Sequence, residues 1–313
     1  MDKSRFLGRD FRKLADWTPD EVLYTLDVAA DLKARAQRRE AHAFFPGYTA
    51  AALFEKPSTR TRTSFQAACA HLGMASFYMR PQEMQLGRGE PVKDTARVLD
   101  RYCDVLFIRT FDQSIVDEFA HYMRHPVINA LTDQYHPCQG LADLLTIREQ
   151  KGAFRGLKVA YAGDVWNVCH SLMTACAMTG IDFCLAHPEG YDPYPEALAN
   201  ARRLAAGSGA RITLTHHLLE AVEGADVVVA NTWHSMGGPE RSKEQRLLDF
   251  LPFQITPQVM ACARPDAIFM HCLPAYRGEE MTEDVLEGPQ SVVFDEAENR
   301  LHTEKALLYL LLG

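Results

Sequence analysis

The chain has 313 residues, 47% of them hydrophobic and 24% charged, a composition typical of a globular protein with room for two domains. Its formal net charge of -8 argues against general binding to nucleic acid or to an acidic membrane, although a local basic pocket for an anion remains compatible with it. The first residues lack the apolar core of a signal peptide, no apolar run is long enough for a membrane span, and the eight cysteines include no Cys-x-x-Cys pair. We therefore expect a cytoplasmic protein with no metal site and no disulfide framework.

Short apolar strands alternate with helical patterns along the whole chain, which indicates parallel α/β units. The predicted strands are 50–54, 75–78, 105–108 and 127–129 in the first half, and 158–162, 182–186, 211–213, 227–230 and 267–271 in the second. A polar connector at 151–156 follows a predicted helix over 139–150 and marks the expected domain boundary. The last helix is predicted to begin near Glu298, with Leu301, Ala306, Leu307 and Leu310 as its apolar face.

Three hydroxyls and two arginines stand together in Ser58-Thr59-Arg60-Thr61-Arg62. A predicted buried strand precedes this segment, and Pro57 ends that strand. Apolar residues at helical spacing follow from Phe65. Ser58 to Thr61 therefore fall at a helix N-terminus, where free N–H groups and the positive end of the helix dipole attract anions. We predict a site for a phosphate-like dianion; the alternative is an ordinary helix cap with solvated arginines. A Walker-type loop and a dinucleotide fingerprint are both absent from the sequence.

Six polar residues lie just after predicted strands, namely Ser58, Arg109, His136, Asn167, Asn231 and Cys272. In doubly wound sheets, ligands bind at the carboxyl ends of the strands. Each residue also has a structural interpretation, such as a strand-end salt bridge for Arg109 or a buried thiol for Cys272. Their shared position favours a single site formed by two α/β domains.

Several segments together resemble the aspartate/ornithine carbamoyltransferase family. Besides the Ser-Thr-Arg-Thr-Arg signature they are Gln85-Leu86-Gly87 with 93–99, His136-Pro137-Cys138-Gln139, His271-Cys272-Leu273-Pro274 and 295–300. The triplet Ser235-Met236-Gly237 is similar to the ornithine branch. The resemblance implies two doubly wound parallel-sheet domains with the active site in the cleft between them. Residues 1–150 would form the carbamoyl phosphate-binding domain, completed by a C-terminal helix over 298–313, and residues 151–297 the ornithine-binding domain.

The resemblance also implies site residues. For carbamoyl phosphate they are Ser58, Thr59, Arg60, Thr61, Gln85, Arg109, His136, Gln139, Cys272, Leu273 and Arg300; for the amine acceptor they are Asn167, Asn231, Ser235 and Met236. Arg109, His136, Asn231 and Cys272 would be the catalytic residues. The loop with Gln85 would enter the active site of a neighbouring subunit, which implies a homotrimer or a multiple of trimers. No cofactor is implied.

The acceptor half of the site departs from the family pattern. Where the ornithine enzymes read Gly-Asp-Gly-Asn-Asn, this chain reads Gly163-Asp164-Val165-Trp166-Asn167, and Asn231 stands where they carry an aspartate. Three interpretations follow: transfer of a carbamoyl group to the side-chain amine of L-ornithine, giving L-citrulline; transfer to another diamino acid or diamine; or a non-catalytic paralogue that binds carbamoyl phosphate. The intact donor motifs disfavour the third. We expect the first, a transferase of arginine metabolism.

Overall fold

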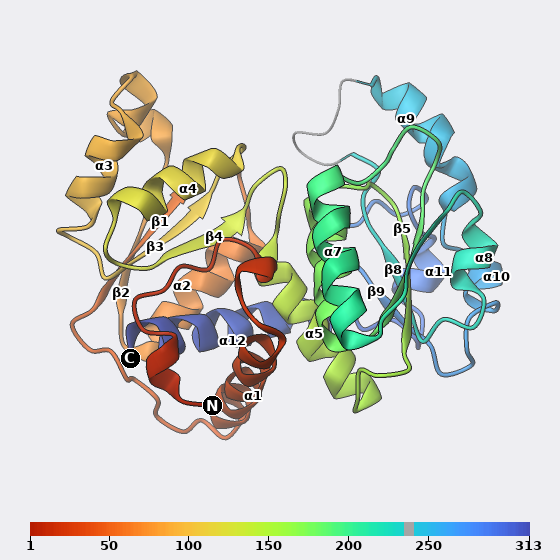
Figure 1. The fold of residues 1–313 in the computed structure, drawn as a ribbon, viewed down its shortest axis with the longest axis horizontal. Coiled ribbons are helices and arrows are strands. Elements are labelled where there is room, and N and C mark those ends of the chain that lie inside the picture. The colour runs from red at the N-terminus through yellow and green to blue at the C-terminus, as the bar shows by residue number, and fades with distance from the viewer. Residues whose placement is uncertain (235–240) are drawn as a thin grey trace. The chain divides into compact units, whose positions relative to one another are not determined.

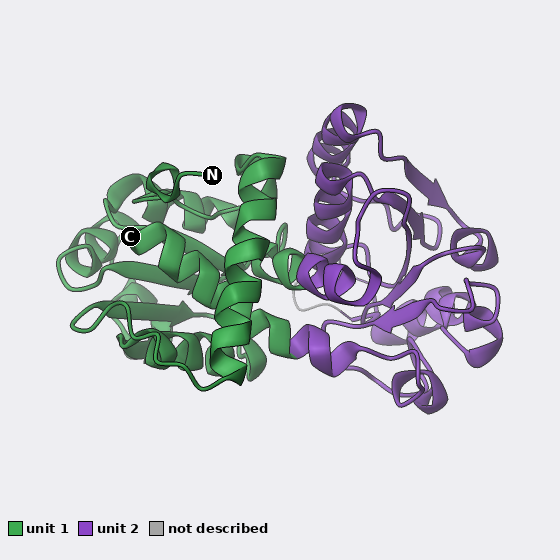
Figure 2. Cartoon of the chain, turned by 90° about the horizontal axis from the view of Figure 1, so that it is seen from below, with its two compact units in different colours: residues 1–142, 298–313 green, residues 143–297 purple. Residues whose placement is uncertain are grey.

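A computed structural model of the chain describes residues 1–234 and 241–313. The chain forms two compact units, the first comprising residues 1–142 and 298–313 and the second residues 143–297 (Figure 2). The division falls inside α5 (Pro137–Lys151), and the first unit is completed by the C-terminal part of α12 (Val293–Leu312).

The first unit is built on a four-stranded parallel sheet of order β2-β1-β3-β4. Its strands are β1 (Thr49–Phe54), β2 (Ala75–Met79), β3 (Val105–Arg109) and β4 (Val127–Leu131), and its other helices are α1 (Pro19–Gln37), α2 (Arg60–Leu72), α3 (Val92–Leu99) and α4 (Gln113–Tyr122). Strands β3 and β4 are buried along their whole length, as expected for the interior of a parallel sheet. Although it ends the chain, α12 lies beside α1 and α2 (Figure 1), because Lys305 Nζ donates to the Leu32 carbonyl and Ser64 Oγ to Glu304.

The second unit is built on a five-stranded parallel sheet of order β7-β6-β5-β8-β9. Its strands are β5 (Lys158–Ala162), β6 (Asp182–Ala186), β7 (Ile212–Thr215), β8 (Val227–Ala230) and β9 (Ile268–Met270). Its helices are α6 (Asn167–Thr179), α7 (Pro195–Ser208), α8 (Leu218–Val222), α9 (Lys243–Phe250), α10 (Pro257–Met260) and α11 (Glu283–Leu286). Small residues of β5 and β8 pack with Phe253, Phe269 and Met281 in one apolar core, and this packing holds the strand ends in place.

Each sheet has one point where the strand order reverses. In the first unit this point lies between β1 and β3, and in the second unit between β5 and β8. Loops diverge there at the carboxyl ends of the strands and leave room for a ligand. A ligand site is therefore expected in the segments that follow β1, β3, β5 and β8.

The predicted α/β class with two parallel sheets is confirmed, and each of the nine predicted strands is present with its ends shifted by two residues or fewer. The last helix was predicted wrongly at its start: α12 begins at Val293 rather than near Glu298. Its acidic first turn, with Asp295 and Glu296, suits the positive end of the helix dipole. The prediction of its buried face was also incomplete. Leu301, which was assigned to that face, is only half-buried, whereas Glu304, which was not, is fully buried.

Candidate active site

The segment predicted to bind an anion, Ser58 to Thr61, lies at the N-terminus of α2, as the sequence predicted. Ser58 Oγ accepts a hydrogen bond from the Thr61 backbone N–H at 3.2 Å, and Arg60 is the first residue of the helix. Inside the helix, Phe65, Ala68, Cys69 and Leu72 are fully buried, so the apolar face fixes the direction in which the first turn points. The helix therefore presents its first N–H groups at the reversal point of the first sheet.

Arg300 of α12 is the centre of a buried polar cluster at this helix end. One of its terminal nitrogens donates to Gln139 Oε1 at 3.0 Å and lies 3.5 Å from His136 Nε2, and the other donates to Thr61 Oγ1 at 3.2 Å. These four side chains are 5% exposed or less. The structure thus joins α2, α5 and α12 at one point, although they are far apart in the sequence (Figure 1).

His136 lies at the end of the segment between β4 and α5, and its surroundings hold it neutral. Burial lowers the pKa of its imidazole well below the usual value, and the charges of Arg300, Arg109 and Arg60 lower it further. Because a guanidinium can only donate, the contact with Arg300 assigns the imidazole proton to Nδ1.

Glu304 is a member of this cluster that we did not predict. It is fully buried one helical turn after Arg300, pairs with a terminal nitrogen of Arg300 at 2.8 Å and accepts from Ser64 Oγ at 2.6 Å. Burial raises its pKa, while Arg300 and Ser64 act in the opposite direction. The i, i+4 spacing of an acid and an arginine was visible in the sequence, but such pairs are usually solvated.

Replacing Glu304 by glutamine is expected to raise KM for the predicted phosphate-bearing substrate about tenfold, because Arg300 loses the charged partner that orients it. The matched control is Glu298→Gln on the same helix, since the Glu298 side chain is 46% exposed and pairs with His302. Steady-state kinetics should leave this control within about twofold of the wild type. Equal KM values for all three proteins would show that Arg300 needs no orientation by Glu304.

In the second unit, Asn231 and Cys272 are brought together. Asn231 follows β8, its backbone N–H donates to Ala162 at 3.1 Å, and its Oδ1 accepts from Cys272 Sγ at 3.4 Å. Gly163 has φ of +141° and packs so closely that a Cβ there would be 2.4 Å from the Asn231 carbonyl oxygen. Only glycine fits at this position, so it allows the close contact between the loop after β5 and the loop after β8.

The other predicted site residues are placed as follows. Asn167 is the buried first residue of α6, and the Leu273 backbone N–H, at a residue with φ of +56°, donates to His271 Nδ1 at 2.8 Å. Thr59 and Gln85 are exposed, Gln85 in front of a 3-10 turn over Leu86–Arg88. The predicted acceptor-binding residues Ser235 and Met236 lie outside the described residues.

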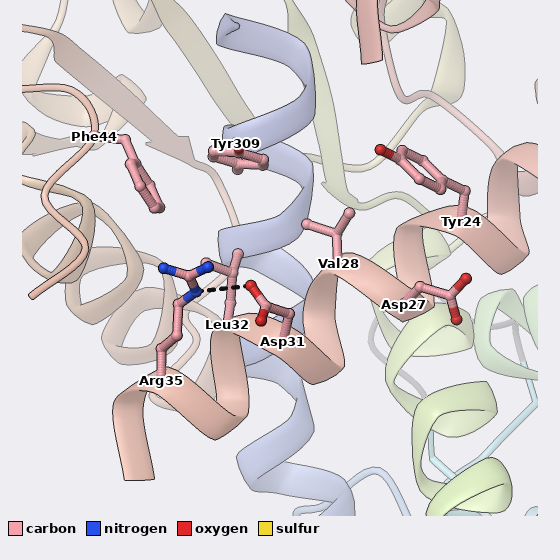
Figure 3. Close-up of a pocket in the computed structure, with 8 residues that line it drawn as sticks. All are labelled: Tyr24, Asp27, Val28, Asp31, Leu32, Arg35, Phe44 and Tyr309. Atoms are coloured by element: carbon pink, nitrogen blue, oxygen red, sulfur yellow. Dashed lines mark hydrogen bonds and ion pairs between the residues drawn. The ribbon is translucent and has the colours of Figure 1, made fainter. Parts of the chain in front are cut away.

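A surface pocket of about 330 Å³ lies elsewhere on the first unit, along α1 and α12 (Figure 3). Phe44 and Tyr309 form part of its wall, and Asp31 and Arg35 pair with each other at 2.7 Å. None of the predicted site residues lines it. Over residues 1–234 and 241–313, no cluster of three or more potential metal ligands is found, and no helix there is both long and apolar enough to cross a membrane.

Comparison with known proteins agrees with this geometry. Residues 9–149 match the carbamoyl-P binding domain of the aspartate/ornithine carbamoyltransferases, and residues 155–311 match their Asp/Orn binding domain. The chain belongs to the aspartate/ornithine carbamoyltransferase family. It is 49% identical to an ornithine carbamoyltransferase of Pyrococcus abyssi over 98% of this chain and 96% of that protein. It is 47% identical to an ornithine carbamoyltransferase of Bacillus subtilis, over 100% and 96% of the two chains.

Solved structures extend the comparison to the fold. The ornithine carbamoyltransferase from Pyrococcus furiosus superposes with a TM-score of 0.95 at 47% identity and covers 98% of each chain. The enzyme of that name from Thermus thermophilus gives a TM-score of 0.87 at 38% identity, over the whole of both chains. The family predicted from the sequence motifs is therefore confirmed.

Proposed function

We propose that the protein transfers the carbamoyl group of carbamoyl phosphate to the side-chain amine of L-ornithine, giving L-citrulline and phosphate. The observation that carries the donor half of this proposal is the convergence of Thr61, His136 and Gln139 on Arg300 at the N-terminus of α2. A helix N-terminus with guanidinium groups binds a phosphate dianion strongly, because each charge-assisted hydrogen bond is about twice as strong as a neutral one. The acceptor half is carried by the names of the relatives, all ornithine carbamoyltransferases.

Each donor-side residue then has a role in the reaction. Ser58 to Thr61 and Arg300 hold the phosphate, and Arg109 contacts both the phosphate and the carbonyl oxygen. His136, neutral and carrying a proton, donates to that oxygen as negative charge develops on it. Gln139 orients the carbamoyl NH2, and the backbone of Leu273 contributes to the same group.

The chemical step needs a neutral amine. Its nitrogen forms a bond to the carbonyl carbon, the tetrahedral intermediate collapses, and the bond from carbon to the phosphate oxygen breaks. The nitrogen gives up one proton, which the departing phosphate accepts. Cys272 and Asn231, in contact with each other, lie beside the amine, while Asn167, Ser235 and Met236 hold the α-amino acid end. We further propose a cytoplasmic homotrimer, or a multiple of trimers, in which Gln85 acts in the neighbouring subunit's site.

Steady-state carbamoylation across a panel of amines tests this proposal. With saturating carbamoyl phosphate, L-ornithine is compared with L-lysine, 2,4-diaminobutyrate, 2,3-diaminopropionate, putrescine and N-acetylornithine. We expect L-ornithine to give the highest kcat/KM. An amine that exceeds it by about tenfold, equal to about 1.4 kcal/mol of transition-state preference, would assign the protein to a different acceptor. If no amine reacts although carbamoyl phosphate binds tightly, the protein is a non-catalytic paralogue.

A further inference from the structure

Arg246 is a buried cation of the second unit to which neither the sequence motifs nor the proposed reaction assigns a task. It lies on α9 and is 4% exposed. Its terminal nitrogen pairs with the Asp164 carboxylate at 2.6 Å, and Asp164 is itself 2% exposed. Burying an ion pair of this kind costs desolvation free energy, and removing one partner strongly destabilises the fold because it leaves an uncompensated buried charge. Such a pair therefore fixes its two segments relative to each other.

The same guanidinium also holds the segment that follows β8. Arg246 Nε donates to the Trp233 carbonyl at 2.7 Å. One turn further along α9, the Phe250 ring stacks on the Trp233 indole with centroids 6.1 Å apart. Trp233 is thus held through both its backbone and its ring by successive turns of one helix.

Both segments that Arg246 holds belong to the reversal point of the second sheet. Asp164 stands between Gly163, which packs on the Asn231 backbone, and the start of α6 at Asn167. Trp233 is two residues after Asn231, which contacts Cys272. The guanidinium, which comes from α9, therefore connects the loop after β5 to the loop after β8.

The helix that carries Arg246 is itself well anchored. Ser242 Oγ caps α9 by accepting from the Gln245 N–H at 3.2 Å. The Arg246 guanidinium lies over the rings of Tyr191 and Phe250, 5.1 and 5.5 Å from their centroids. A planar, forked side chain with aromatic support is suited to making two directional contacts at once, and lysine is not.

We propose that Arg246 is a positioning residue for the amine acceptor: it sets the separation of the Asn167 and Asn231 loops and thereby the fit of the amine. This inference takes the identity of the amine from the proposed function. The contacts of Arg246 with Asp164 and Trp233 do not depend on it. Misplacing a binding group by about 1 Å can cost up to about 10²-fold in rate, so the effect of losing the guanidinium should be large. The effect should also be selective for the amine, because the whole cluster around Arg300 lies in the first unit, whereas Arg246 lies in the second.

The test compares Arg246→Met and Arg246→Lys with the control Arg241→Met. Arg241 also lies over the Tyr191 ring, at 4.3 Å, but its side chain is 39% exposed and it pairs with Asp249. We expect Arg246→Met to raise KM for L-ornithine by about tenfold or more with KM for carbamoyl phosphate within about twofold. Arg246→Lys, which keeps the charge beside Asp164, should fall between this variant and the wild type. The control should match the wild type.

Amide hydrogen exchange of the segment over 228–234 gives a second readout that needs no reaction. The Asn231 N–H, bonded to Ala162, should exchange faster in Arg246→Lys than in the control. If the wild type carbamoylates no amine, the proposed function fails, and the exchange rates still decide the role of Arg246. The inference is overturned if exchange is unchanged in Arg246→Lys, or if the KM values for both substrates rise in parallel.

Discussion

Replacing Arg60 by alanine should lower kcat/KM for carbamoyl phosphate by about 10³-fold. Arg60 is the first residue of α2 and lies close enough to His136 to depress the pKa of its imidazole. Its guanidinium can supply two charge-assisted hydrogen bonds to a phosphate that becomes more negative as it leaves. Removing a single preorganised donor of this kind commonly costs about 10²- to 10³-fold in kcat. Initial rates at varied carbamoyl phosphate and saturating L-ornithine measure the effect.

Arg62→Gln is the matched control, two residues further along the same helix. Arg62 is exposed, and its guanidinium lies 3.8 Å from the centroid of the Tyr78 ring rather than at the cluster around Arg300. We expect this variant to stay within about threefold of the wild type. If Arg60→Ala also stayed within about tenfold, the assignment of the helix N-terminus to the phosphate would be wrong.

The strands could be predicted because a buried parallel strand has a strong local pattern. β3 is apolar up to Arg109 at its end, β4 is apolar except for Asn129, and β5 and β8 consist mainly of Val and Ala, so consecutive residues indicate burial on both faces. The pairing order of the strands carries no such signal, and only the alternation of strands and helices indicated parallel sheets.

The start of α12 shows where a local pattern fails. The residues before Glu298 include Phe294, which is 63% exposed, and two acids, so no apolar stripe marks the first turn. Later in the helix, Glu304 and Lys305 are fully buried although their side chains are charged. They are accommodated by partners on other elements, Glu304 by Ser64 of α2 and Lys305 by the Leu32 carbonyl of α1. A helical pattern of one segment cannot reveal such partners.

The candidate site residues differ in how much of their placement the sequence reveals. The position of Ser58 to Thr61 at a helix N-terminus could be predicted, because a buried strand, a proline, capping hydroxyls and an apolar helical pattern follow one another there. Glu304 was missed because an acid four residues from an arginine is usually solvated, and its burial against Ser64 of another helix leaves no local signal. Arg246 was missed because its partner, Asp164, is distant in the sequence. That the cluster around Arg300 and the pair Asn231 and Cys272 belong to one cleft remains a prediction.

The distribution of charge explains why His136 is suited to its proposed role. Burial lowers the pKa of its imidazole well below the usual value, and the charges of three guanidinium groups lower it further, so the charged form is disfavoured. In the neutral range of pH it is therefore uncharged and can donate one hydrogen bond to the carbonyl oxygen without adding another positive charge. The pH dependence of kcat/KM reports the groups of the free enzyme, so this range should show no acid limb from His136.

Replacing His136 by alanine should lower kcat about 10²-fold, because one donor to the developing oxyanion is lost. The profile of log kcat/KM against pH should keep its shape between pH 6 and 8, since the residue removed does not titrate there. His121→Ala is the control, because His121 is exposed on α4 and contacts the Tyr122 ring. An acid limb near pH 6.5 in the wild type that disappears in His136→Ala would show that the imidazole titrates at its ordinary pKa. Burial and the neighbouring guanidinium charges would then not hold the imidazole neutral.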